Sequence, residues 1–222
     1  MSFSNEWDNA FAAGTHMSIW PWSDLVSYVS RYAGPKEQFR RVLELGCGMG
    51  ANIPFFMQRG CDYHAVEGSS TAVKHLKMVY PHLADSIICA DFTVDIPFGG
   101  QFDLVVDRGS TPHNPTAAVQ QTLRIVFDKL RPAGKFIGID WFSDAHEGAR
   151  KGFAVDDYTR RDIEFGSLKD LGFVHFFSRH HLLDLLSEAG FFVERLEHKV
   201  SVVSFPSDDE PLAWWHFSAV KK

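Results

Sequence analysis

Five short apolar runs alternate with stretches of helical periodicity along most of this chain, and the alternation restricts the folds that the chain can adopt. The runs span residues 41–45, 62–66, 86–90, 102–106 and 135–140, and the helical stretches between them span 52–59, 71–80 and 115–130. Near-continuous apolar runs of this length are typical of strands that helices cover on both faces. The pattern therefore predicts an α/β fold around a parallel sheet.

The C-terminal part of the chain adds one helix and two strands to this pattern. Ser178 is a suitable N-cap for the helix, and Gly190 suits the left-handed residue at its end. Strand-like segments follow at 191–196 and 212–220, and the turn-forming cluster at 208–211 predicts that they pair antiparallel at one sheet edge. Together with the earlier runs, they predict a three-layer, doubly wound sheet of seven strands, mostly parallel with an antiparallel last strand.

Two segments lie outside the strand–helix alternation. Residues 1–34 precede the first strand and include a predicted helix at 23–32, whereas residues 142–177 form a long polar excursion after the fifth strand. A length of 222 residues suits one α/β domain. We expect a single domain spanning 1–222, with 1–34 as a helical lid and 142–177 as a substrate-cap insertion.

Composition and charge exclude several classes of protein. The 22 Lys and Arg against 28 Asp and Glu give a net charge of −6, which disfavours a nucleic-acid partner. No apolar stretch is long enough to span a membrane, and the acidic start does not resemble a signal peptide, so we expect a cytoplasmic protein with no membrane partner. The three cysteines, Cys47, Cys61 and Cys89, lack metal-site spacing and are expected to be buried, reduced thiols.

Histidine spacing gives no sign of a metal centre. The chain has 11 histidines, but His180 and His181 are adjacent rather than four residues apart, and neither an HExxH motif nor a clustered carboxylate pattern occurs. We therefore predict no metal site.

The loop after the first strand contains three closely spaced glycines, Gly46, Gly48 and Gly50. Without Cβ atoms, their backbone can approach a ligand closely, and the carboxyl ends of parallel strands are where such sheets bind ligands. The spacing Gly46-x-Gly48-x-x-Ala51 also satisfies the dinucleotide fingerprint, which keeps an NAD(P)-dependent oxidoreductase open. Glu44 argues against a pyrophosphate and favours a ligand that carries an ammonium group.

Glu44-x-Gly46-x-Gly48-x-Gly50 resembles the first motif of class I S-adenosylmethionine-dependent methyltransferases. Further segments resemble that family in the same order along the chain. They are Glu67 after the second strand, Cys89-Ala90-Asp91-Phe92, Phe102 to Asp107, Leu130 to Phe136 and Leu185 to Phe191. The resemblance covers roughly residues 40–222 and implies the strand order 3-2-1-4-5-7-6.

The resemblance also implies a set of cofactor contacts. In that family the acid at Glu67 holds both ribose hydroxyls, the acid at Asp91 contacts the adenine amino group, and the side chain at Phe92 packs on the adenine ring. Asp107 is expected to help seat the methionine end. The full set of residues expected to bind S-adenosylmethionine, and its product S-adenosylhomocysteine, is Glu44, Gly46, Cys47, Gly48, Gly50, Glu67, Gly68, Asp91, Phe92 and Asp107.

The residues that bind the methyl acceptor are harder to predict from the sequence than those that bind the cofactor. Methyl transfer requires alignment and desolvation of the acceptor more than particular side chains. His113 is the candidate base, since a neutral imidazole accepts a proton near pH 7, although a plain loop or capping histidine is the alternative. The further candidates for substrate or lid contacts are His16, Trp20, Trp22, Arg108 and Trp141, with core packing as the alternative for the aromatic residues.

The function implied is methyl transfer to an O, N or S atom of an acceptor. Asp107-Arg108-Gly109 resembles a loop of thiopurine-type and other small-molecule methyltransferases, and the Asn/Asp-Pro-Pro-aromatic tetrad that is frequent in enzymes acting on nucleic acid or protein amides is absent. Both features favour a small-molecule acceptor. A protein that binds S-adenosylmethionine without catalysis, as a sensor or scaffold, remains an alternative. The sequence does not indicate the oligomeric state.

Overall fold

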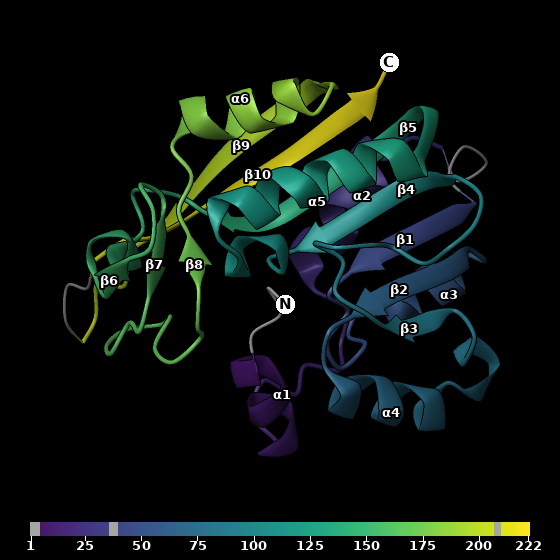
Figure 1. Cartoon of the computed structure of the whole chain (residues 1–222), viewed down its shortest axis with the longest axis horizontal. Coiled ribbons are helices and arrows are strands. Elements are labelled where there is room, and N and C mark those ends of the chain that lie inside the picture. Colours follow the sequence, from purple (N-terminus) through teal and green to yellow (C-terminus); the bar gives the residue numbers. More distant parts are fainter. Residues whose placement is uncertain (1–4, 36–39, 207–209) are drawn as a thin grey trace.

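The computed structural model describes residues 5–35, 40–206 and 210–222. A seven-stranded sheet forms its centre, in the order β3-β2-β1-β4-β5-β10-β9 (Figure 1). The strands are β1 (Arg41–Leu45), β2 (Asp62–Glu67), β3 (Ile87–Cys89), β4 (Phe102–Arg108), β5 (Leu130–Phe142), β9 (Phe191–Ser201) and β10 (Leu212–Lys221). Strand β10 runs opposite to the other six strands of this sheet. Counted within this sheet, β9 and β10 are the sixth and seventh strands, so the predicted fold class is confirmed.

Helices cover both faces of the sheet. On one face, α5 (Thr116–Lys129) and α6 (Arg179–Glu188) bury Leu123, Val126 and Leu185 in a core with Phe136 and Phe217. A second core lies on the other face, where α2 (Ser23–Tyr32), α3 (Ile53–Gln58) and α4 (Ser70–Val79) pack against β1, β2 and β4. The two cores explain the continuous apolarity of the central strands.

Local sequence signals fix the ends of α6. The Ser178 side chain accepts a hydrogen bond from the backbone N–H of His181, as expected for an N-cap. Gly190 follows the helix with φ +98°, and a Cβ at this position would lie 2.8 Å from the ring of Phe127. A side chain at residue 190 would therefore be strained by its backbone and would clash with its surroundings.

Residues 142–177 have secondary structure of their own. Three short strands, β6 (Phe153–Ala154), β7 (Thr159–Arg161) and β8 (Val174–His175), form a second, antiparallel sheet. It lies far from α4 in Figure 1. Phe142, Ile163, Leu168, Val174 and Phe176 form a separate small core beneath it. The 3-10 turns are η2 (Pro81–Leu83), η3 (Thr111–His113) and η4 (Glu147–Arg150).

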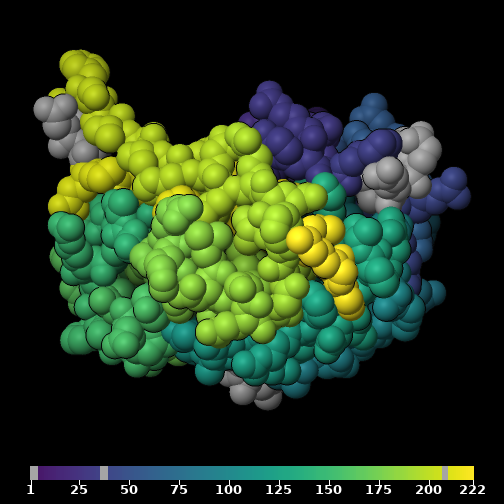
Figure 2. All heavy atoms as spheres, turned by 90° about the horizontal axis from the view of Figure 1, so that it is seen from above, coloured from purple at the N-terminus to yellow at the C-terminus, as the bar shows by residue number. Residues whose placement is uncertain are grey.

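The N-terminal segment contains an additional helix that we did not predict, α1 (Asn5–Ala12), which lies beside α4 (Figure 1). At the opposite edge of the sheet, the chain beyond β9 forms a narrow projection (Figure 2). Val202, Val203 and Phe205 are exposed there. Part of the turn predicted at 208–211 lies outside the described residues.

The cysteines differ in burial. Cys47 and Cys61 are buried free thiols, as expected, but the prediction is wrong for Cys89, which is exposed. Cys89 ends β3, the edge strand of the sheet, where no further strand covers it. Among the described helices, none combines the length and the apolar character that crossing a bilayer requires.

Candidate functional site

A cavity of about 410 Å³ opens at the carboxyl ends of β1 to β4. Its size lies in the usual range for ligand sites. We call one part the glycine-loop end, defined by Gly46, Gly48, Glu67 and Asp91, and the other the aromatic end. The aromatic end is defined by Trp7, His16, Trp22, Arg108 and His113. The remaining lining residues are Phe11, Met17, Ser18, Glu44, Cys47, Met49, Ala51, Asn52, Gly68, Ala90, Phe92, Thr93, Gly109, Ser110 and Asn114.

The glycine loop requires two of its glycines. A Cβ on Gly46 would lie 2.3 Å from the Cβ of Ser110, and Gly46 has φ +61°. Gly50 has φ +82° and packs against Leu76 and Ile53. It supports the loop from behind and does not line the cavity, in contrast to its predicted place among the cofactor contacts. The backbone of Gly46 to Gly48 remains as the cavity wall.

Glu67 ends β2 with its carboxylate directed at the glycine loop. Its two oxygens accept hydrogen bonds from the backbone N–H groups of Gly48 and Ser69, both at 2.8 Å. Burial raises the pKa of Glu67, and these backbone donors oppose the rise. Because a backbone N–H group holds each oxygen, the orientation of this carboxylate is fixed before a ligand binds.

Glu44 lies deeper, at the centre of β1. Its carboxylate accepts hydrogen bonds from Asn52 Nδ2 at 2.8 Å and from the Tyr63 hydroxyl at 2.6 Å. Burial raises the pKa of Glu44 to about 7, although both hydrogen bonds lower it. The carboxyl group therefore changes its charge in the physiological pH range.

Asp91 and Asp107 hold the loops that follow β3 and β4. One oxygen of Asp91 accepts hydrogen bonds from the backbone N–H and the hydroxyl of Thr93, at 3.0 and 2.6 Å. Asp107 is completely buried and accepts hydrogen bonds from the backbone N–H groups of Ser110, at 2.9 Å, and Thr111. Burial raises its pKa. Asp107 shapes the cavity through this loop and does not line it.

Helix α1 contributes Trp7 and Phe11 to the cavity wall. Asp8 accepts hydrogen bonds from the Ser69 hydroxyl at 2.5 Å and from the backbone N–H of Thr71 at 3.1 Å, which ties α1 to the start of α4. Phe11 lies against Gly48, where an added Cβ would be 3.5 Å from its ring. Sequence reasoning missed these contacts because an eight-residue helix has too few turns to show a clear periodicity.

The aromatic end is built around Trp7. Its ring meets the ring of His113 edge-on at 4.9 Å between centroids and that of His16 at 5.3 Å, and Phe11 lies at 5.9 Å. Trp22 adds a second aromatic surface, over which the Arg108 guanidinium stacks at 3.5 Å from the ring centroid. As expected, His16, Trp22, Arg108 and His113 line the same cavity. Trp7 lines it as well, although the sequence did not predict this.

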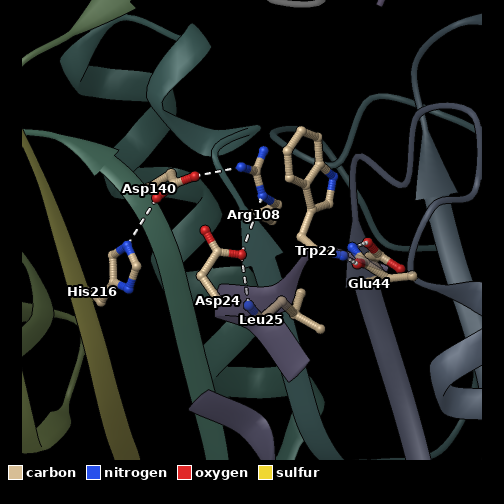
Figure 3. Close-up of polar contacts among 8 residues, drawn as sticks. Trp22, Asp24, Leu25, Glu44, Arg108, Asp140 and His216 are labelled. Carbon is tan, nitrogen blue, oxygen red and sulfur yellow. Dashed lines mark hydrogen bonds and ion pairs between the residues drawn. The ribbon is translucent and has the colours of Figure 1, made fainter. Parts of the chain in front are cut away.

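Arg108 belongs to an ion-pair network that extends into the sheet (Figure 3). Its Nη2 lies 2.6 Å from Asp140 Oδ2, and its Nε lies 3.8 Å from Asp24 Oδ1. His216 contacts the other oxygen of Asp140 at 2.8 Å. Asp140 has φ +57°, a strained value for a non-glycine residue. This backbone conformation allows β5 to present the carboxylate to both partners.

Asp24, Asp140 and His216 also form a cluster whose possible ligand atoms lie within 4.8 Å of one another. The guanidinium of Arg108 contacts both carboxylates of this cluster, so their charge already has a cationic partner. Burial alone would raise the pKa of Asp140, but the hydrogen bond with His216 and the charge of Arg108 hold it below its usual value. The geometry is that of a partly buried ion-pair network, in which only His216 is fully buried.

His113 is buried in η3 with a fixed tautomer. Its Nδ1 lies 3.1 Å from the carbonyl oxygen of Phe173. Because a carbonyl can only accept, Nδ1 carries the proton and Nε2 carries the lone pair. Burial lowers the pKa of His113 to about 4, so the ring is neutral at pH 7 but is a weaker base than the sequence suggested.

Two aromatic candidates lie away from the cavity. Trp141 is completely buried between Phe136, Phe177 and Phe217, so it belongs to the core and our expectation of a substrate contact is wrong. Its position at the end of a strand made it look accessible in sequence. Trp20 is 75% exposed and does not line the cavity.

The segment 142–177 supports the cavity indirectly, through its contacts with His113. Its Phe173 carbonyl fixes His113, and the ring of Phe142 packs edge-on against His113. Several of its polar side chains, among them Arg150 and Arg160, line a separate hollow of about 250 Å³. No residue of 142–177, all of which the structure describes, lines the main cavity.

Comparison with known proteins now gives the family. A family model described as "Methyltransferase domain" matches residues 15–196. This chain belongs to that methyltransferase family. Its predicted place among class I S-adenosylmethionine-dependent methyltransferases, and S-adenosylmethionine as its cofactor, are thereby confirmed.

Solved structures of similar fold agree with the methyltransferase family. An S-adenosylmethionine-dependent methyltransferase from Methanosarcina mazei superimposes with a TM-score of 0.67 at 16% identity, over 91% of this chain and 98% of the other. The 1,6-didemethyltoxoflavin-N1-methyltransferase of Burkholderia thailandensis, solved with its substrate and S-adenosylhomocysteine, gives 0.62 at 16% identity, over 98% and 84%. At these identities the likeness concerns the fold.

A sequence relative with a curated function covers a smaller part of this methyltransferase. The ribosomal RNA small subunit methyltransferase A of Porphyromonas gingivalis is 32% identical over 83 residues, which is 35% of this chain and 31% of that protein. The match thus spans about a third of each protein.

Proposed function

We propose that this methyltransferase transfers the methyl group of S-adenosylmethionine to an O, N or S atom of a small-molecule acceptor. The observation that carries the proposal is one continuous cavity that is lined by Glu67 and Asp91, by Arg108 and His113, and by residues of α1. A volume of about 410 Å³ lies in the range of small-molecule sites.

The glycine-loop end fits S-adenosylmethionine in the chemistry of its groups. The Glu67 carboxylate is positioned to accept hydrogen bonds from a ribose diol, and Phe92, which lines the cavity beside Asp91, offers an apolar face for adenine. Glu44 suits the ammonium group of the methionine part. In this assignment the backbone of Gly46, Cys47, Gly48 and Gly68 forms the surface beneath the cofactor, whereas Gly50 and Asp107 support that surface indirectly.

When bound, S-adenosylmethionine supplies an activated methyl group, and a lone pair of the acceptor forms the new bond to carbon while the S–CH₃ electron pair stays on sulfur. The protein contributes alignment and exclusion of water. A proton on the acceptor atom passes to His113 Nε2 or to water. Because the pKa of His113 is about 4, it takes the proton only as methylation makes the acceptor more acidic.

Two other cofactor or acceptor types are less well supported. A nicotinamide dinucleotide brings a pyrophosphate, but the glycine-loop end presents Glu44, Glu67 and Asp91, and its lining contains no Lys or Arg among the described residues. An RNA acceptor, suggested by the ribosomal RNA methyltransferase relative, needs a basic surface, whereas this chain has a net charge of −6.

The proposal also includes the setting of the reaction. We place the enzyme in the cytoplasm, where its free cysteines Cys47, Cys61 and Cys89 stay reduced. Its partners in this proposal are the cofactor and a small acceptor, without nucleic acid or membrane.

The first test is calorimetry with S-adenosylmethionine, S-adenosylhomocysteine, NADH and NADPH, followed by an acceptor screen with radiolabelled methyl groups. We expect binding of the two adenosyl compounds alone, and label transferred to a small molecule. Binding of a nicotinamide cofactor instead would contradict the proposal. Cofactor binding with label transferred only to RNA would refute the small-molecule acceptor, and no transfer to any acceptor would favour a sensor.

A further inference from the structure

Aromatic rings form much of the surface at the aromatic end of the cavity. Trp7 forms edge-on contacts with His16 and His113 within 5.3 Å, and Trp22 lines the cavity as a second indole. Met17 lies between them in sequence and also lines the cavity, where its flexible thioether adapts to ring edges. Such walls pack best against a flat aromatic ligand.

The charges at the aromatic end are already paired. Arg108 is the one Lys or Arg among the described lining residues, and its guanidinium contacts Asp140 and Asp24 while stacking on Trp22. An anionic acceptor would have to compete with two carboxylates for this cation. Of the lining carboxylates, Glu67 and Asp91 belong to the glycine-loop end, and both oxygens of Glu44 already accept hydrogen bonds, from Asn52 and Tyr63. A charged acceptor therefore finds no unpaired partner of opposite sign at the aromatic end.

His113 adds one directional polar contact. Since Nδ1 donates to the Phe173 carbonyl, the lone pair of Nε2 is available for a donor on the ligand. The amide nitrogen of Asn114, by contrast, is within 3.1 Å of the Thr111 carbonyl and already donates to it. The polar requirement is thus an N–H or O–H group on the acceptor.

From these observations, we infer that the acceptor is an uncharged, planar aromatic or heteroaromatic molecule with an N–H or O–H group that faces His113. This inference rests on the proposed function. It also identifies Trp7 and Trp22 as residues that determine specificity. The methylated atom is then that N or O, which passes its proton to His113 or water as the bond to the methyl carbon forms.

A matched set of probes tests the inference on the full chain saturated with S-adenosylhomocysteine. 2-Naphthol is flat, neutral and carries a donor; 2-naphthoate is anionic; decahydro-2-naphthol is not flat; and 2-methoxynaphthalene has no donor. Dissociation constants come from ligand-observed NMR, with a 12-nucleotide RNA as a further arm. We expect 2-naphthol to bind at least tenfold more tightly than 2-naphthoate or the saturated alcohol, and severalfold more tightly than the methyl ether.

Variants connect this preference to the cavity. Trp7→Leu and Trp22→Leu keep apolar volume but remove a ring, and each should weaken 2-naphthol binding about tenfold. Phe165→Leu, a change at a ring that is 71% exposed in the cap, is the matched control and should have no effect. His113→Leu should abolish the difference between 2-naphthol and its methyl ether.

The outcomes separate this inference from the proposed function. If S-adenosylhomocysteine itself does not bind in calorimetry, the proposed function fails. If it binds, but 2-naphthoate, the saturated alcohol or RNA binds more tightly than 2-naphthol, or no probe binds, the inference alone is overturned. Equal losses in Phe165→Leu and Trp7→Leu would also overturn it.

Discussion

The glycine-loop end of the cavity is assembled from loops that directly follow β1, β2 and β3, whereas the aromatic end gathers side chains from segments far apart in the chain. Gly46, Glu67 and Asp91 each follow a strand of the same parallel sheet. Trp7 and Trp22, in contrast, come from the N-terminal segment, where Trp7 packs against His113 and Trp22 packs against Arg108, both far away in the sequence. Only the first kind of site has a position that the fold class dictates.

The two ends also differ in how their groups are held in place. The glycine-loop end uses backbone N–H groups and buried carboxylates, which a rigid sheet holds in place. The aromatic end depends on the position of α1. Asp8 attaches this helix to the start of α4 by accepting two hydrogen bonds. Four predictions test this comparison.

The largest effect is expected in the core, at an aromatic residue that the sequence assigned to the cavity. Trp141→Ala should lower the free energy of unfolding by about 3–5 kcal/mol, because it removes a completely buried indole from between Phe136, Phe177 and Phe217. Chemical denaturation measures the change. Trp20→Ala is the control, and its effect should stay within about 0.5 kcal/mol because Trp20 is 75% exposed. Equal losses of stability in the two variants would contradict the assignment of Trp141 to the core and of Trp20 to the surface.

At the glycine-loop end, Glu67→Ala should weaken S-adenosylhomocysteine binding by about 2 kcal/mol, or roughly thirtyfold. The variant loses the acceptor of the ribose hydroxyls and the support that Glu67 gives to the backbone of Gly48. Titration calorimetry gives the dissociation constant. Asp95→Ala, which removes an exposed carboxylate near the same cavity edge, should bind as the wild type does. An unchanged constant in Glu67→Ala would remove Glu67 from the site.

The carboxyl group of Glu44 gives a pH dependence of known sign. Its pKa is raised to about 7, so it is mostly neutral at pH 6 and mostly charged at pH 7.5. If the charged form pairs with the ammonium group of the ligand, affinity rises about eightfold across this interval. Glu44→Gln should bind with nearly constant affinity over the same range. Parallel pH profiles for the wild type and the variant would exclude Glu44 as the ionising group.

The sequence predicted the sheet and the glycine-loop end well because both depend on local signals. Apolar runs locate the strands, and the parallel order places Glu44, Glu67 and Asp91 at one edge whatever the rest of the chain does. These residues line the cavity as the resemblance implied, whereas Gly50 and Asp107 lie just behind the lining. The distinction between lining and support depends on side-chain direction, which motif spacing does not give.

The aromatic end was only partly predictable. His16 and Trp22 were found because they lie in an unusually aromatic segment, but the same argument included Trp20, which does not line the cavity, and missed Trp7. Burial, which lowers the pKa of His113 to about 4, arises from the cap at Phe173 and Phe142 and has no signature near residue 113. Long-range packing decides which of several similar side chains reaches the cavity.

The smallest effect concerns the attachment of α1, on which the aromatic end depends. Asp8→Ala removes the hydrogen bonds to Ser69 and Thr71, and the first of these is the main reason that the pKa of Asp8 lies below its usual value. At this partly exposed site the two bonds together contribute about 1 kcal/mol, so we expect S-adenosylhomocysteine to dissociate about fivefold faster, with little change in its association rate. Stopped-flow fluorescence measures both rates, since Trp7 lines the cavity. Asn9→Ala changes an exposed residue on the same helix and should leave both rates unchanged. Identical dissociation rates in Asp8→Ala and the wild type would mean that α1 does not retain the ligand.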